Sequence, residues 1–110
     1  MARLLELDEP PTAVVCASDL MALGAIGTAV ERGLRVPGDV SIVGFDDIQL
    51  AGYVQPPLTT LRQEKARLGA EAGRALTRLI AARAAEKEAM TLPVELIVRA
   101  STAPPPDGSR

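Results

Sequence analysis

Two short apolar runs around one helical stretch constrain the fold of this 110-residue chain more than any other feature. Residues 12–17 and 40–43 form the runs, and turn signals bound both, as is typical of strands buried in a parallel sheet. A strand, a helix and a strand with short links predict a βαβ unit with parallel strands and a right-handed crossover. The helical stretch between the runs repeats apolar residues at helical spacing, namely Leu20, Leu23, Ile26 or Gly27, and Val30.

Polar side chains follow both predicted strands. Ser18 and Asp19 come after the first, where either side chain can cap the helix, and Asp46 and Asp47 come after the second. Ligands of open parallel sheets bind beyond the carboxyl ends of the strands, so we expect a binding site at this edge. Because neighbouring strand residues point to opposite faces, we expect only one aspartate of the pair to face a cleft, while the other caps or is solvated.

The rest of the chain predicts a simple series of further elements. The first of them is the end of a helix, which suggests that something precedes it. The whole series comprises a helix end over 2–7, a loop over 48–57, a strand over 58–63, a helix over 64–85, a strand over 92–99 and a disordered tail over 104–110.

The composition excludes several kinds of site. The chain has no His, which excludes a histidine base, a Ser-His-Asp triad and a His-ligated metal. Its one Cys, Cys16, can form neither an internal disulfide nor a cysteine zinc site, and we interpret it as a small core residue. No glycine pattern matches a nucleotide-binding loop. We therefore expect no catalytic residue, no cofactor and no metal site.

Charge and hydropathy limit the partners. The net charge of −2 argues against a broad basic surface for nucleic acid, and we interpret the +3 of residues 62–88 as a solvated helix face. The start lacks the apolar core of a targeting segment, and no apolar run reaches the roughly 18 residues of a membrane helix. The default expectation is a cytoplasmic protein without membrane contact.

Three stretches, in this order, together resemble the lactose/galactose repressor (LacI/GalR) family of bacterial transcription regulators. They are PTAVVCASDLMALGAIGTAVERGLRVPGDVSIVGFDD, PPLTTLRQ and LPVELIVRAST, and the likeness runs from about residue 4 to 103. It implies an α/β fold: a parallel-sheet lobe of the periplasmic-binding-protein-like type (type I), of which this chain is a C-terminal fragment. By the same likeness, residues 1–103 are a partial sensor domain, in which 1–61 and 92–103 belong to the C-terminal lobe and 64–88 form a helix of the companion N-terminal lobe.

The resemblance also implies roles for single residues. Ser18 stands where many members have an effector-contacting Asn, and Asp46 is the first Asp of the G-[FY]-D-D pattern, which often binds effector hydroxyls or base nitrogens. The shorter Ser side chain leaves the type of small-molecule effector open, with a sugar as the first expectation. Leu23, Gly27 and Tyr53 correspond to parts of the dimer interface of a homodimeric parent. The helix-turn-helix that contacts operator DNA has no counterpart in these residues.

Three alternatives stay open from the sequence. The first is a sugar-binding transport protein, which shares the two-lobe fold. The second is a small enzyme that uses Asp46 and Asp47 with magnesium. The third is a truncated product that does nothing alone or pairs with an intact regulator through residues 19–30. The resemblance also implies that the 64–85 helix exposes Leu68, Leu76 and Leu79 without the sheet that it normally covers, which predicts marginal stability or self-association.

Overall fold

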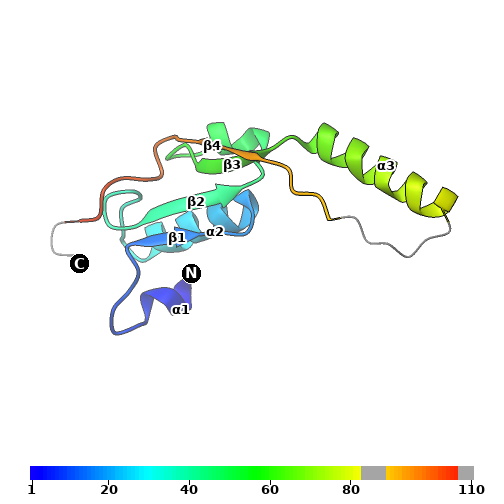
Figure 1. Cartoon of the computed structure of the whole chain (residues 1–110). Coiled ribbons are helices and arrows are strands. Elements are labelled where there is room, and N and C mark those ends of the chain that lie inside the picture. Colours follow the sequence, from blue (N-terminus) through cyan, green and yellow to red (C-terminus); the bar gives the residue numbers. More distant parts are fainter. Residues whose placement is uncertain (83–88, 107–110) are drawn as a thin grey trace. The chain divides into compact units, whose positions relative to one another are not determined.

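The computed structural model describes residues 1–82 and 89–106 (Figure 1). The predicted helices and strands are present, and the predicted loop over 48–57 contains a short 3₁₀ helix, η1. The end of the helix predicted over 64–85, and residues 107–110 of the predicted tail, lie outside the described residues. In chain order the elements are α1 (Ala2–Leu5), β1 (Ala13–Val15), α2 (Asp19–Glu31), β2 (Ser41–Phe45), η1 (Gln49–Gly52), β3 (Thr59–Gln63), α3 (Lys65–Ala82) and β4 (Val94–Ile97).

The strands form one sheet in the order β1-β2-β3-β4. β1 and β2 pair in parallel, with Val15 opposite Val43, so the predicted parallel βαβ unit is confirmed. β2 and β3 also pair in parallel, with Phe45 opposite Leu61. The first three strands therefore end at the same edge of the sheet, which is where an open parallel sheet places its ligand.

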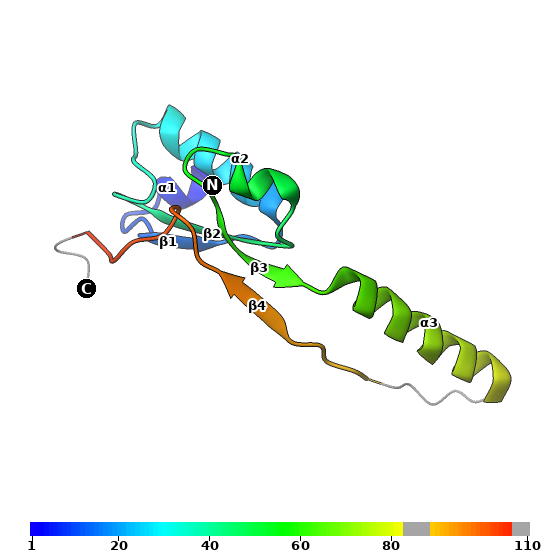
Figure 2. The ribbon, with the colours of Figure 1, turned by 90° about the horizontal axis from the view of Figure 1, so that it is seen from above.

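Helix α2 packs on the sheet through small side chains, and Figures 1 and 2 show it running along β1 and β2. The predicted apolar stripe is partly wrong, because Leu20 is 68% and Val30 59% exposed. The helix is apolar almost all round, so spacing alone cannot identify the buried side, and alanines allow the closest approach to a sheet. The residues of α2 that are buried in the core are Ala22, Ala25, Ile26 and Ala29.

The chain divides into two compact units. The first unit comprises Met1–Arg62 and Leu96–Arg110, and the second comprises Gln63–Glu95. The first unit holds the core, in which Val40, Ile42 and Leu58 are the large apolar side chains that are almost fully buried. In the second unit none of the residues of α3 is buried.

Residues 99–103 complete the hydrogen bonding of the first unit. The amide of Ile42 donates to the carbonyl oxygen of Ser101 at 2.9 Å. The hydroxyl of Ser101, which is fully buried, accepts from the amide of Thr59 at 2.8 Å and donates to the carbonyl of Ile42. This segment thus joins β2 to the start of β3, and the strand amides there have partners as buried backbone groups require.

Candidate functional site

Ser18 follows β1 and begins helix α2. It is the N-cap residue, with extended backbone at φ −153°, and its Oγ accepts a hydrogen bond from the amide of Met21 at 3.3 Å. The capping role predicted for Ser18 or Asp19 is therefore filled by Ser18. A hydroxyl both donates and accepts, so capping leaves the Ser18 O–H group able to donate to a ligand.

Asp19 has a structural role. Its side chain is fully buried, and one carboxylate oxygen accepts from the hydroxyl of Thr60 while the other accepts from the amide of Ile48 at 2.8 Å. The carboxylate thereby ties the start of α2 to the segment after β2 and to β3. Gly44 makes this approach possible, because a Cβ there would collide with an Asp19 carboxylate oxygen and lie 2.9 Å from a methyl of Leu58.

Asp46 and Asp47 form a strained turn at the end of β2. Both have positive φ, at 114° for Asp46 and 49° for Asp47, a region that residues other than glycine rarely adopt. Each such residue costs of order 1–3 kcal/mol and persists only where its surroundings fix it. The half-buried Asp46 donates its amide to the carbonyl of Leu61 at 2.8 Å, which continues the β2–β3 pairing into the turn.

Asp47 is held by two arginines. Its side chain is only 8% exposed, and its oxygens accept from Arg62 Nε at 2.7 Å and from Arg99 Nη2 at 2.6 Å. Arg99 also donates through Nη1 to the carbonyl of Leu58 at 2.8 Å. Burial raises the pKa of Asp47, but the hydrogen bonds and positive charges of Arg99 and Arg62 outweigh it and lower the pKa below its ordinary value. The carboxylate is therefore charged and already paired.

Sequence reasoning missed this cluster. Arg62 and Arg99 lie 15 and 52 residues from Asp47, so neither local spacing nor helical periodicity relates them to it. The one available signal was that each arginine stands at or near the end of a predicted strand, 58–63 or 92–99, in a sheet whose edge carries a pair of aspartates.

The predicted dimer-interface residues have different environments. Leu23 is half-buried and packs against the core, whereas Gly27 is exposed and a Cβ there would meet nothing within 4 Å. Tyr53, directly after η1, is 79% exposed. The structure holds no second chain, so the role of these three residues stays a prediction.

In residues 1–82 and 89–106 no three His, Cys, Asp or Glu side chains gather as metal ligands would. Cys16 is buried, as predicted, and burial raises the pKa of its thiol, which makes it unreactive. None of the helices in these ranges has the length and apolar character needed to cross a membrane.

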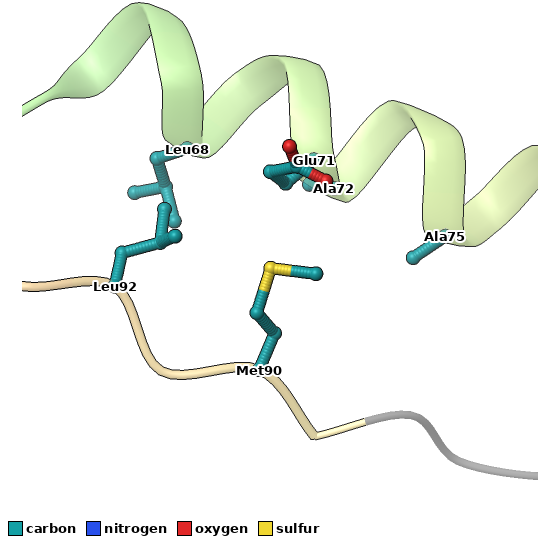
Figure 3. Close-up of a pocket in the computed structure, with 6 residues that line it drawn as sticks. All are labelled: Leu68, Glu71, Ala72, Ala75, Met90 and Leu92. Carbon is teal, nitrogen blue, oxygen red and sulfur yellow. The ribbon is translucent and has the colours of Figure 1, made fainter.

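The second unit contains a hollow of its own between α3 and the returning chain (Figure 3). Its volume is about 180 Å³, and Met90 and Leu92 point from the returning chain toward the helix. Its single charged group, Glu71, pairs with Arg74 at 2.7 Å. A largely apolar hollow of this size suits side-chain packing better than a polar ligand. It is lined by Leu68, Glu71, Ala72, Ala75, Met90 and Leu92.

Comparison with known proteins gives the family. Residues 1–102 match the family model of the periplasmic binding protein-like domain. The chain is 48% identical over 101 residues to the HTH-type transcriptional repressor PurR of Mannheimia succiniciproducens, a match that covers 92% of this chain and 30% of the relative. The chain thus spans less than a third of the length of that relative.

Solved structures agree in fold. A protein of Bacillus cereus subsp. cytotoxis described as transcriptional regulator LacI superposes with a TM-score of 0.83 at 32% identity, over 93% of this chain and 36% of that one. A LacI family transcriptional regulator of Enterococcus faecium with bound ribose has a TM-score of 0.74 at 36% identity, over 94% and 38%. The chain therefore belongs to the periplasmic binding protein-like family, in the branch of the LacI/GalR-type transcriptional regulators.

Proposed function

We propose that this chain supplies the effector-binding edge of the sensor of a LacI/GalR-type transcription regulator, and that Ser18 and Asp46 contact the effector. The observation that carries this is their placement, because they follow the ends of β1 and β2, two adjacent parallel strands. The Enterococcus faecium relative holds ribose, which supports a sugar or a similar polyhydroxylated molecule. A carboxylate and a hydroxyl suit such a ligand, since hydrogen bonds to a charged acceptor are the stronger kind.

The proposed domain boundaries follow the same reasoning. Residues 1–103 form a partial sensor, with 1–61 and 92–103 in the C-terminal lobe and 64–88 a helix of the N-terminal lobe. The division into two units near residues 62 and 96 supports this assignment. The other half of the effector cleft then comes from residues outside this sequence.

Regulation follows from lobe closure over the effector. Closure that changes the geometry of a homodimer couples effector binding to operator affinity, typically by about 1–3 kcal/mol. Leu23, Gly27 and Tyr53 belong to the proposed dimer interface, and the exposure of Gly27 and Tyr53 supports that. Operator contact belongs to a helix-turn-helix outside these residues, and the place of action is the cytoplasm.

The alternatives are less well supported. Magnesium chemistry at Asp46 and Asp47 would need both carboxylates, whereas that of Asp47 is engaged by two guanidinium groups. A sugar-binding transport protein shares the fold, but the relatives described above are named as transcription regulators.

Replacing Asp46 by Ala tests the proposed function. Ribose is the first probe, followed by a disaccharide and a nucleobase, each titrated into the ¹⁵N-labelled chain within the full-length parent regulator, which supplies the other lobe, while amide chemical shifts are recorded. We expect the bound probe to shift the amides around Ser18 and Asp46. Asp46→Ala should weaken binding by about 10- to 100-fold, the usual effect of removing a hydrogen bond to a charged group.

The matched control is Asp39→Ala. Asp39 is also an aspartate in a turn next to β2, but it lies before that strand, at its opposite end, and pairs with Arg35. It should leave the affinity unchanged. Equal affinity of the Asp46→Ala variant and the original chain would remove Asp46 from the site.

A further inference from the structure

We infer that Asp47 is a positioning residue, which Arg99 and Arg62 hold in place so that the turn after β2 presents the Asp46 carboxylate at the edge of the sheet. The purpose of this arrangement rests on the proposed function of Asp46. The arrangement itself rests on backbone geometry and on contacts within the first unit.

The strain of the turn is the first step. Two consecutive residues other than glycine have positive φ, and although aspartate tolerates this region better than most residues, two in a row are rare. Contacts must therefore hold the turn from outside. The amide of Asp46 donates to Leu61 O and the amide of Ile48 donates to the Asp19 carboxylate, so both flanks of Asp47 are anchored by their backbone.

The side chain of Asp47 is the third anchor, and its contacts are the strongest. Both oxygens of a nearly buried carboxylate take charged donors, at 2.6 Å from Arg99 and at 2.7 Å from Arg62. Arg99 is itself fixed, because its backbone amide donates to the hydroxyl of Thr59 at 2.9 Å and its guanidinium donates to Leu58 O. Asp47 thus connects the turn to a rigid part of the sheet.

The two arginines also occupy special positions along the chain. Arg62 is the last residue of the first unit before the chain enters the second, and Arg99 follows soon after its return at Leu96. The carboxylate of Asp47 therefore holds together the segments on either side of this excursion. A role in placing Asp46 predicts that residue 47 needs a carboxylate, because one oxygen bonds to Arg99 and the other to Arg62.

Asp47→Asn tests the inference without any ligand. In the ¹⁵N-labelled full chain, the three-bond coupling between the amide proton and the Hα of Asp46 reports its φ. The exchange of the Asp46 amide with deuterium reports its bond to Leu61. We expect the coupling to move toward the value of an extended residue. We also expect the exchange to accelerate at least about tenfold relative to the amide of Ile42, which bonds to Ser101.

Two further variants complete the design. Asp39→Asn removes the charge from another aspartate held by an arginine, Arg35, and should leave both Asp46 readouts unchanged. Arg62→Ala changes a side chain that is 48% exposed, so we expect this variant to fold. It therefore tests the inference if Asp47→Asn does not fold. It should shift the Asp46 readouts in the same direction by less, because Arg99 still holds Asp47.

The outcomes separate the two proposals. Altered φ and faster exchange at Asp46 in folded Asp47→Asn support the positioning role, whether or not ribose binds. Unchanged coupling and exchange at Asp46 in folded Asp47→Asn overturn it, and if Asp47→Asn does not fold, unchanged readouts in Arg62→Ala overturn it. The proposed function has a separate test, the sugar titration without substitutions, and it fails if no probe shifts the amides around Ser18 and Asp46.

Discussion

At the scale of single residues, acid stability depends on where carboxylates are paired. The pKa of Asp47 lies below its ordinary value of 3.8, and the bonds from Arg35 lower the pKa of Asp39 to about 2. A carboxyl group whose pKa is lowered by folding stabilises the fold above its unfolded pKa. That stabilisation is lost as the pH falls through the folded pKa.

We therefore expect the urea midpoint of the chain to be flat from pH 7 to 5 and to fall below about pH 4. In Asp47→Asn the urea midpoint should fall less steeply below pH 4, because residue 47 no longer takes up a proton on unfolding. Part of the fall that remains should come from Asp39. Urea titrations of both proteins at pH 7, 5, 4 and 3 measure the difference. Parallel curves would show that Asp47 makes no pH-dependent contribution.

Residue-scale chemistry was only partly visible in the sequence. The positions of Ser18 and Asp46 after two strands followed from the order of apolar runs and turns, and the parallel pairing confirms that their strands end at one edge. The pairing of Asp47 with Arg99 could not be predicted, because contacts between residues 52 apart depend on how the sheet is assembled. Positive φ at Asp46 likewise had no local signal.

At the scale of elements, α2 shows what periodicity can and cannot predict. Its start at Ser18 and its end near Gly33 followed from capping chemistry, and Gly33 has the positive φ, 78°, of a helix-ending glycine. Its buried face did not follow from side-chain size. Alanines face the sheet while Leu20 and Val30 face outward, because a helix that packs closely needs small residues at the contact.

The glycines of α2 give a prediction at this scale. A Cβ at Gly24 or Gly27 would meet nothing within 4 Å, so Ala fits and removes the flexibility of an unfolded glycine. Gly24→Ala and Gly27→Ala should each stabilise the chain by about 0.5–1 kcal/mol. Urea unfolding at low protein concentration measures this.

Gly33→Ala is the contrasting control, because positive φ disfavours any residue with a Cβ. It should destabilise the chain. Destabilisation by Gly24→Ala or Gly27→Ala as well would show that these helix positions have a close neighbour that the structure does not contain.

At the scale of the whole molecule, many large apolar side chains lie on the surface and not in the core. None of the residues of α3 is buried, and Leu76 is 59% and Ile80 70% exposed on one face of it. Val15, at the open edge of β1, is 74% exposed. Exposed apolar side chains that share one face of a helix, as Leu76 and Ile80 do, promote association.

We expect the chain to self-associate as its concentration rises, with α3 as the main contact. Leu76→Lys combined with Ile80→Lys should lower the apparent mass in sedimentation velocity without lowering the unfolding midpoint of the first unit, because neither side chain belongs to its core. Leu20→Lys combined with Val30→Lys, on the outer side of α2, is the matched control. A larger effect of this control would assign the contact to α2 instead.

The segment around Ser101 has a consequence for how the protein is made. In β2, the amide and the carbonyl of Ile42 both bond to Ser101, which the ribosome adds 59 residues after Ile42. At typical rates of 5–20 residues per second, synthesis of that stretch takes roughly 3–12 s, during which the whole second unit is also translated. We therefore expect the first unit to complete its folding only after Ser101 has left the exit tunnel. Until then the amide and carbonyl groups of Ile42 that bond to Ser101 lack these partners.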